Sequence, residues 1–479
     1  MTTAADTADP TLIQRLQAAL GADLVLFGQA TAAYCSDWHG DVQTGAVAVL
    51  RPRNTEQVSA CLRTAKALGL GVVPQGGRTG LVLGAVPDTP DRQVVLSLER
   101  MNRIRRIDPD DFSAEIEAGV VLQALKDALA EQDLFFPLAL GAQGSCQIGG
   151  NLSTNAGGVN VLRYGMTRDL VLGLEVVLPD GRVLDMRSRL RKDNRGIDLK
   201  QLFIGAEGTL GIITAATLKL CPLPEQTATA LLALDCLEDA ITLFQLARRQ
   251  CCDLMSAFEF LPPLAFTLAR EAMPDLTPPM PMDSPAYVLM DLSGSGLVDI
   301  SALMERFLEL ALAEGLVRDG VIAQSQAQAR ALWIIREGMN EGQARRGRHL
   351  RTDLSVPLSC LPDFVAQAEA AVTQALPGAI CVSYGHVGDG NVHLNVLPAP
   401  GTDADTQIEM AKKLIHQVLA EFDGSISAEH GIGRLKRGDF QQSLPDTQRD
   451  LLQAIKRAID PDQMMNPNCL QELDQRVAK

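Results

Sequence analysis

The glycine-rich stretch at residues 141–158 limits most strongly how this chain can fold. GAQGSCQIGGNLSTNAGG contains six glycines in 18 residues. Glycine inside a helix or a strand costs roughly 0.5–1 kcal/mol relative to alanine, so this run is unsuited to long regular structure. Glycine lets a backbone come close to a ligand and turn its N–H groups towards phosphate oxygens. Small hydrogen-bonding side chains lie between the glycines, at Ser145, Ser153, Thr154 and Asn155.

Two more glycine loops accompany this stretch. PQGGRTG, residues 74–80, follows the apolar strand GVV, and FIGAEGTLGIIT spans residues 203–214. The first is neither a Walker loop, since no G-K-[ST] follows, nor a G-x-G-x-x-G motif. Taken alone, it is explained equally well by an ordinary loop. The three loops together favour a long, phosphate-bearing ligand laid across backbone.

The remaining pattern predicts an α+β chain with a domain boundary at the proline pair 222 and 224. Residues 44–77 predict a strand, a helix with Thr55 as its N-cap, and a second strand. Residues 170–186 predict a hairpin with its turn at Asp180-Gly181. After residue 225, strands and helices suggest a sheet covered by helices. The other expected strands are 93–98, 113–118, 228–235, 256–260 and 286–292, and the other expected helices are 11–21, 121–132, 237–249, 298–314, 326–343, 362–376, 404–422 and 445–459.

Charge and cysteine content argue against several classes of protein. The formal net charge is −15 and the isoelectric point about 4.9, so the chain repels phosphate backbones and we expect no nucleic-acid partner. No signal peptide and no run of roughly 18 apolar residues is visible, so no transmembrane segment is expected. The ten cysteines are scattered without a C-x-x-C, which argues against a disulfide framework, a zinc ribbon and an iron–sulfur cluster. A cytoplasmic location is expected.

Two of the six histidines lie in SYGHVGDGNVHLNV, residues 383–396. Glycines rule out a helix there, and the flanks are typical of strands. A two-residue turn at Asp389-Gly390, a favoured pair for such turns, places His386 opposite His393. Opposed residues share one face with Cβ atoms about 4.5–5.5 Å apart, so both imidazoles can reach one metal ion. Asn395 faces the same side.

A second segment adds a carboxylate. SAEHGIGRLKR, residues 427–437, places Glu429 beside His430. Two histidines, one glutamate and an open position form the usual catalytic zinc arrangement, and Mn, Fe or Co accept similar ligands. The residues alone leave two interpretations open, a divalent metal site and polar tips of an exposed hairpin.

These motifs carry a family resemblance. The three glycine loops and RYG at residues 163–165 resemble the FAD-binding domain of the vanillyl-alcohol oxidase and p-cresol methylhydroxylase (PCMH) superfamily. GHVGDGNVHLN and AEHGIG resemble the C-terminal domain of its FAD-linked D-2-hydroxyacid dehydrogenases, and most of all the enzymes for D-2-hydroxyglutarate. The resemblance implies an α+β fold in three parts. These are an N-terminal helical extension at 1–29, a two-lobed PCMH-type FAD-binding domain at 30–222, and an α+β substrate and metal domain with a C-terminal helical segment at 223–479.

The resemblance also implies FAD contacts. Binding is expected to be non-covalent, because residues 74–84 contain neither His nor Cys, and Cys146 in the second loop is the one residue that could overturn this. Where the family usually has Gly-Lys after its final Asn-Pro pair, this chain has Asn468 and Cys469. The expected contacts are Pro74, Gly76, Gly77, Thr79, Gly80, Ser145, Gly150, Ser153, Asn155, Gly158, Glu207, Gly208, Ile213 and Asn466.

For the reaction, the resemblance implies one divalent metal, zinc in the first place, on His386, His393 and Glu429, with His430 as the catalytic base. Arg336 matches the family's arginine for the substrate carboxylate. The other expected substrate contacts are Asn340, Arg351 and Asn395.

Arg351 bears on the choice of substrate. The hydroxyglutarate enzymes have a lysine there, and a second cation suggests a second carboxylate on a small anionic 2-hydroxyacid. We therefore expect a dicarboxylate such as D-2-hydroxyglutarate or D-malate, with a D-lactate or glycolate dehydrogenase (FAD subunit) as the alternative within the family.

Partners and rival classes stay open at this level. The electron acceptor is expected to be an electron-transfer flavoprotein, a quinone or oxygen, and a homodimer is one of the oligomeric states that the sequence permits. A zinc hydrolase with simple glycine turns, and a nucleotide-binding scaffold without catalysis, are the rivals from other classes.

Overall fold

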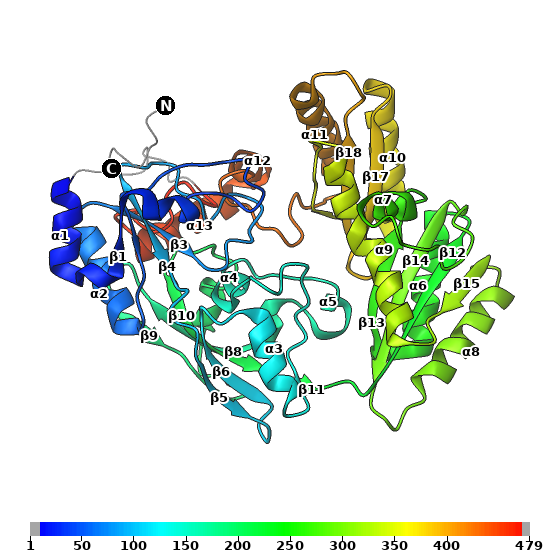
Figure 1. Cartoon of the computed structure of the whole chain (residues 1–479), viewed down its shortest axis with the longest axis horizontal. Coiled ribbons are helices and arrows are strands. Elements are labelled where there is room, and N and C mark those ends of the chain that lie inside the picture. The colour runs from blue at the N-terminus through cyan, green and yellow to red at the C-terminus, as the bar shows by residue number, and fades with distance from the viewer. Residues whose placement is uncertain (1–9, 472–479) are drawn as a thin grey trace. The chain divides into compact units, whose positions relative to one another are not determined.

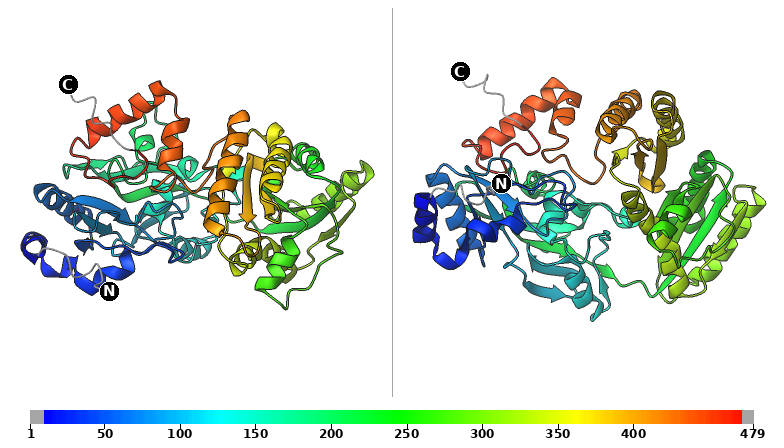
Figure 2. Two further views of the ribbon diagram at one scale, coloured as in Figure 1. Left: turned by 90° about the horizontal axis from the view of Figure 1, so that it is seen from above. Right: turned by 45° about the horizontal axis from the view of Figure 1, so that its top comes forward.

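The computed structural model describes residues 10–471, which fold into two compact units (Figure 1). The first contains the described parts of residues 1–156, 166–223 and 429–479, and the second contains residues 157–165 and 224–428. In both views of Figure 2, the red helices near the C-terminus accordingly lie with the blue N-terminal part of the chain. The boundary between residues 223 and 224 lies within a residue of the expected one. The division differs from the expected one elsewhere, because residues 157–165 belong to the second unit and the last described segment, from residue 429, returns to the first unit.

The first unit contains a four-stranded sheet in the order β1-β2-β4-β3. Strands β2, β3 and β4 are parallel, and helix α2 makes the crossover from β2 to β3 that parallel strands need. Leu16 of α1 is buried in the same core as Leu62 and Val72, so this helix is part of the unit and no separate extension. The bounds are β1 Val25–Leu26, β2 Ala48–Leu50, β3 Gly71–Gln75, β4 Gln93–Ser97, α1 Pro10–Leu20 and α2 Thr55–Ala67.

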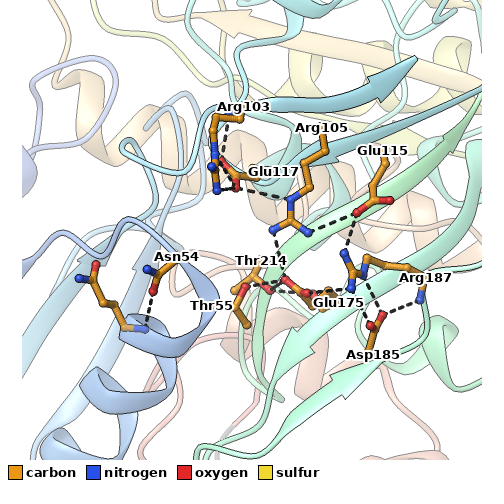
Figure 3. A network of polar contacts seen from close by, with 11 residues as sticks. Asn54, Thr55, Arg103, Arg105, Glu115, Glu117, Glu175, Asp185, Arg187 and Thr214 are labelled. Carbon is orange, nitrogen blue, oxygen red and sulfur yellow. Dashed lines mark hydrogen bonds and ion pairs between the residues drawn. The ribbon is translucent and has the colours of Figure 1, made fainter. Parts of the chain in front are cut away.

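The second sheet of this unit is antiparallel, in the order β5-β6-β10-β8-β9. Its buried Glu175 accepts hydrogen bonds from the hydroxyls of Thr55 (2.6 Å) and Thr214 (2.7 Å), which tie α2 to the sheet (Figure 3). Asn54, and not Thr55, therefore caps α2, through a 2.9 Å bond from the N–H of Gln57. The bounds are β5 Ile104–Asp108, β6 Ser113–Glu117, β8 Val171–Val177, β9 Val183–Asp185, β10 Ile212–Lys219 and α3 Leu122–Ala130.

The second unit is built on a seven-stranded antiparallel sheet in the order β15-β12-β14-β13-β17-β18-β16. Helices α6 and α8 pack on one face of the sheet, and α10 and α11 cover the same face near β16 and β18. Helices α7 and α9 pack on the opposite face. The strands are β12 Gln226–Leu234, β13 Met255–Leu261, β14 Ala286–Gly294, β15 Asp319–Ile322, β16 Leu354–Ser355, β17 Ile380–His386 and β18 Asn391–Leu397. The helices are α6 Leu237–Cys251, α7 Ala265–Ala272, α8 Ile300–Ala313, α9 Gln326–Arg345, α10 Leu361–Ala375 and α11 Ala404–Glu421.

The remaining elements are short or lie near the C-terminus. They are α4 Ile148–Ser153, α5 Val161–Tyr164, β7 Leu134–Phe135, β11 Cys221–Pro222, α12 Arg437–Ser443 and α13 Asp446–Ile459. Among residues 10–471, no helix combines the length and the apolar character that crossing a bilayer demands.

The hairpin of β17 and β18 differs from the expected one. Tyr384, and not His386, lies opposite His393, and the turn contains a short 3-10 segment before Gly390 in the left-handed region (φ 78°). The strands separate there because the end of β17 pairs with β13 and the start of β18 pairs with β16. The register is displaced by two residues, which preserves the face of every side chain. His386 and His393 therefore still face the same side.

Helices α7 and α9 approach each other closely through two glycines of α9. A Cβ atom at Gly338 would lie 3.3 Å from Cα of Ala269, and one at Gly342 would lie 2.0 Å from the carbonyl oxygen of Leu268. Since a side chain at Gly342 would overlap the backbone of α7, this glycine sets the distance between the helices.

We expect Gly342→Ala to lower stability by ~1–3 kcal/mol through overpacking, although glycine to alanine in an open helix is stabilising by about 1 kcal/mol. Gly438→Ala in α12 is the matched control, because nothing lies within 4 Å of a Cβ at that position. Thermal and urea unfolding of both variants would be compared. Stabilisation of Gly342→Ala to the level of the control would show that the helix spacing does not depend on this glycine.

Candidate active site

The three glycine loops of the first unit pack against one another. A Cβ atom at Gly77 would lie 2.1 Å from the carbonyl oxygen of Ser145, and one at Gly208 would lie 2.6 Å from Cγ of Pro74. No side chain fits at these contacts, so the glycines permit a backbone approach that other residues would block. The structure thus brings together the loops that the sequence analysis connected.

The same loops also leave backbone beside open space. A Cβ at Gly80 or Gly150 would have no other atom within 4 Å. Nearby in sequence, the buried Oε1 of Gln147 and Oδ1 of Asn151 have no hydrogen-bond partner among the described residues. Leaving such an acceptor unsatisfied costs about 1–3 kcal/mol, which a ligand with N–H or O–H donors removes. The open backbone can bind phosphate groups, and the unsatisfied acceptors can bind N–H or O–H donors. A flavin dinucleotide carries both kinds of group, so the loops fit this cofactor.

Several of the expected flavin residues use their side chains to hold the loops in shape. Ser153 Oγ donates to the carbonyl of Gly149 (2.7 Å), and Asn155 Oδ1 accepts from the N–H of Arg168 (2.9 Å). Their side chains therefore stabilise the cradle from within. The first unit contains Pro74, Gly76, Gly77, Thr79, Gly80, Ser145, Gly150, Ser153, Asn155, Glu207, Gly208, Ile213 and Asn466, whereas Gly158 lies in the segment that folds with the second unit.

The carboxylate of Glu207 anchors the segment that follows Glu429 and His430. It accepts hydrogen bonds from the N–H groups of Ile432 (2.8 Å) and Gly433 (2.7 Å). Glu207 is buried, which raises its carboxyl pKa, while these backbone bonds oppose that rise. A flavin contact of Glu207 would therefore use its backbone, because its side chain holds this segment.

Asn466 lies beside Glu207 and joins three segments. Its amide donates to the carbonyls of Gly84 (3.0 Å) and Glu207 (2.7 Å), and its oxygen accepts from Arg434 (2.8 Å). Asn468 adopts a positive φ of 62°, which asparagine tolerates better than most residues, so it can stand in for the family's glycine. The side chain of Cys469 contacts Glu207 (3.4 Å).

In the second unit, helix α9 presents a polar stripe to the face of the sheet. The stripe has the 3, 4, 3 spacing of one helix face, and its four side chains meet partners on four adjacent strands. The pairs are Trp333 with Asp291 on β14 (3.0 Å), Arg336 with Glu259 on β13 (2.9 Å), Asn340 with Tyr384 on β17 (2.6 Å) and Gln343 with Asn395 on β18 (2.9 Å).

Arg336 is held from two directions. Its Nε donates to Oε2 of Glu259, and its guanidinium lies over the ring of Tyr384, 4.7 Å from the centroid. Among the described residues, no hydrogen bond involves its two Nη groups. Burial alone would raise the pKa of Glu259, but His386 and Arg336 together lower it to about 2, so the carboxylate is ionised.

The two histidines of the hairpin have their Nδ1 atoms engaged by oxygen acceptors. Nδ1 of His386 lies 2.5 Å from Oε1 of Glu259, and Nδ1 of His393 lies 3.1 Å from the carbonyl oxygen of Thr352. An ionised carboxylate and a carbonyl only accept, so both rings carry a hydrogen on Nδ1. In the neutral rings Nε2 then holds the lone pair, as in metal-ligating histidines that an oxygen acceptor orients from behind.

The two histidines are therefore suited to bind a metal ion through their Nε2 atoms. The two rings lie with centroids 6.0 Å apart and an interplanar angle of 78°. Within residues 10–471, however, no group of three or more His, Cys, Asp or Glu side chains is placed to hold an ion. Glu429 and His430 belong to the first unit, so the second unit by itself supplies two of the three expected ligands.

Arg351 and Asn395 have different surroundings. Arg351 is exposed and donates from Nε to Nε2 of His349 (3.3 Å), and no carboxylate of the described residues pairs with it. Asn395 is buried, donates to Tyr384 (3.1 Å) and Gln343, and accepts from the N–H of Thr352. Arg351 is thus available for a charged ligand, whereas Asn395 helps to order the site.

Sequence reasoning missed Glu259 and Tyr384. Strand β13, MSAFEFL, is buried throughout, and Glu259 is its one charged residue. A charge within an apolar strand requires a buried partner, and this unusual position is the sequence signal by which Glu259 could have been found. Tyr384 lies within the quoted hairpin, two residues before His386, which places it on the same face.

Comparison with known families assigns both parts of the chain. Residues 46–187 match the FAD binding domain, and residues 223–470 match the C-terminal domain of FAD linked oxidases. Among solved structures, p-cresol methylhydroxylase with substrate bound has a TM-score of 0.75 at 18% identity, covering 96% of each chain. Alkyldihydroxyacetonephosphate synthase has a TM-score of 0.73 at 17% identity, covering 96% of this chain and 84% of that one. Both show the same fold.

Curated relatives are considerably more similar in sequence. D-2-hydroxyglutarate dehydrogenase of Danio rerio, a mitochondrial protein, is 40% identical over 90% of this chain and 79% of its own length. The D-2-hydroxyglutarate dehydrogenase of Xanthomonas citri pv. viticola is 39% identical over 92% of both chains. A mitochondrial protein of Schizosaccharomyces pombe, provisionally named a D-lactate dehydrogenase, is 37% identical over 91% of this chain and 84% of its own.

The expected fold class is thereby confirmed, with an α+β PCMH-type FAD-binding domain and an α+β C-terminal domain. With matches along nearly its whole length, the chain belongs to the family of FAD-linked oxidases and is an FAD-dependent enzyme.

Proposed function

We propose that this enzyme oxidises a D-2-hydroxyacid with two carboxylates, such as D-2-hydroxyglutarate or D-malate, to the 2-oxoacid. The relatives named for D-2-hydroxyglutarate support the substrate class. The observation that carries the proposal is the group formed by Arg336, Glu259 and the two hairpin histidines. In this group a guanidinium of fixed orientation accompanies two imidazoles whose Nδ1 atoms are hydrogen-bonded, which leaves their Nε2 atoms as the metal-binding nitrogens.

Arg336 binds the carboxylate next to the reacting carbon. Glu259 occupies its Nε and Tyr384 lies against its face, so the Nη groups are the part of the guanidinium left for a ligand. A guanidinium edge and a carboxylate form paired, charge-assisted hydrogen bonds. Because both supports hold the guanidinium before binding, the substrate is oriented at little entropic cost.

His386, His393 and Glu429 would hold one divalent metal, and Zn, Mn, Fe or Co suits such ligands. When bound, the ion acts as a Lewis acid on the substrate hydroxyl. His430 takes the hydroxyl proton, since imidazole accepts protons near neutral pH. When bound, FAD accepts the hydride from the substrate carbon.

Arg351 binds the distal carboxylate. It is an exposed guanidinium with no carboxylate partner among the described residues, and its Nε donates to Nε2 of His349 (3.3 Å). A D-lactate or glycolate substrate has no group for it. The Schizosaccharomyces pombe relative keeps D-lactate as the second candidate.

The first test concerns the cofactor. We expect FAD to be bound without a covalent link, because Cys146 is 2% exposed and burial raises its thiol pKa, which lowers its reactivity. Acid precipitation should leave a colourless pellet and a yellow supernatant, and a D-2-hydroxyacid should bleach the flavin bands of the native enzyme. A yellow pellet contradicts the non-covalent link, and a protein without flavin bands contradicts the proposed reaction.

The second test concerns the metal. Chelation should abolish turnover but keep the flavin spectrum, and His393→Ala should retain less metal after dialysis. His416→Ala on α11 is the matched control, because that helix packs on the other face of the sheet. His430→Ala should keep the metal and lose at least ~10²-fold in kcat, as expected for removal of a general base. Full metal content and activity in His393→Ala would exclude the site.

The third test concerns specificity. A charge-assisted hydrogen bond is worth about 1.5–3 kcal/mol, so the parent should prefer a dicarboxylate over D-lactate by at least ~10-fold in kcat/KM. Arg351→Ala should remove that preference. Arg348→Ala should leave it unchanged, because Arg348 pairs with Asp405 at the surface (2.9 Å). A parent enzyme that prefers D-lactate, or an Arg351→Ala variant whose kcat/KM falls equally on all substrates, would favour a D-lactate or glycolate dehydrogenase instead.

A further inference from the structure

Glu259 is the one charged residue of strand β13 and is completely buried. It lies opposite His386 on β17 and opposite Leu289 on β14, so it is surrounded by sheet on both sides. A buried carboxylate is costly unless donors satisfy it. Its donors therefore explain why it is tolerated in this position.

The two oxygens of Glu259 bind two different elements. Oε2 accepts from Nε of Arg336 on α9 (2.9 Å), and Oε1 accepts from Nδ1 of His386 on β17 (2.5 Å). One rigid carboxylate thus links the guanidinium proposed for the substrate to an imidazole proposed for the metal. Neither neighbour can rotate without breaking its bond to Glu259.

We propose that Glu259 is a positioning residue that fixes both the orientation of Arg336 and the ring orientation and Nδ1–H form of His386. This inference rests on the proposed function, in which Arg336 binds the substrate carboxylate and His386 binds the metal. It deepens that function, because a single side chain then sets the spacing between the two places where the substrate is held.

Glutamine has nearly the same shape but cannot replace Glu259 chemically. Its amide has one acceptor oxygen, and its nitrogen only donates. If the oxygen serves Arg336, the amide nitrogen faces His386 and forces the other tautomer, with the hydrogen on Nε2. If the oxygen serves His386, the amide N–H groups face the guanidinium of Arg336. Glu259→Gln therefore disturbs one of the two functions with little change in volume.

The strand next to β13 offers a matched control. Asp291 on β14 is partly buried, with its Oδ1 atom enclosed, and it also binds α9, through Nε1 of Trp333 (3.0 Å). Burial raises its pKa to about 6, so a neutral amide is a mild change there. No hydrogen bond or ion pair of Asp291 among the described residues involves Arg336 or His386. Asp291→Asn thus removes a carboxylate under α9 without breaking the hydrogen bonds of Glu259 to Arg336 and His386.

The experiment compares the full-length holoenzyme with Glu259→Gln, Glu259→Asp and Asp291→Asn. The readouts are zinc affinity by competition with a chromogenic chelator, kcat and KM with D-2-hydroxyglutarate, flavin content and thermal stability. We expect Glu259→Gln to weaken zinc binding by ~10–100-fold, as removal of an orienting partner does, or to raise KM by at least ~10-fold. Asp291→Asn should stay within ~3-fold of the parent in both.

Flavin content should be unchanged in all three variants, because the cradle belongs to the first unit. Glu259→Asp keeps the charge and two acceptor oxygens but is one methylene shorter. It should recover part of the loss seen with glutamine, and a purely structural role of buried volume would not produce that rescue. If Glu259→Gln does not fold, parental zinc affinity and KM in Glu259→Asp would overturn the inference.

The measurements distinguish failure of the proposed function from failure of the positioning role of Glu259. A parent enzyme that binds no zinc and is not bleached by a D-2-hydroxyacid overturns the proposed function and this inference with it. A parent that passes both tests, with Glu259→Gln equal to it or Asp291→Asn as impaired as Glu259→Gln, overturns the inference alone.

Discussion

Buried carboxylates that accept hydrogen bonds from segments distant in the sequence stabilise each of the two units. Glu207 receives the N–H groups of residues 432 and 433, more than 200 positions along the chain. Glu259 joins Arg336 and His386, which are 77 and 127 positions away. Each desolvated carboxylate is stable only while its donors are in place, so the placement of those donors and the local fold depend on the same bonds.

Helix α9 transmits this constraint across the second unit. Its polar stripe meets four adjacent strands in order, while its glycines allow close contact with α7. The helix is therefore fixed both by hydrogen bonds on the side of the sheet and by steric contact on the side of α7. A residue on this stripe, such as Arg336, is located to within a rotamer, which is what selective binding of a carboxylate needs.

Local signals predicted much of the fold. Periodicity and turn residues gave most helices and strands within a few residues, and the glycine loops indicated the cradle. The errors arose where contacts with residues distant in the sequence determined the local structure. The preference of Asp389-Gly390 for a tight turn lost to the pairing of β17 with β13 and of β18 with β16. Thr55 was expected as a cap but binds Glu175, 120 positions away. The return of residues 429–471 to the first unit, and the link through Glu259, depend on contacts that no sequence window contains.

The path of the chain has a consequence for how the first unit is made. Val72 of β3 bonds to the backbone of Met464 and Asn466, and Lys456 donates to the carbonyl of Thr209. The second unit is therefore an insertion between the beginning and the end of the first. During synthesis the ribosome must release nearly 400 further residues after β3 before its last backbone partners exist, so the inserted unit has time to fold alone. The flavin cradle is then one of the last parts of the protein to acquire its final support.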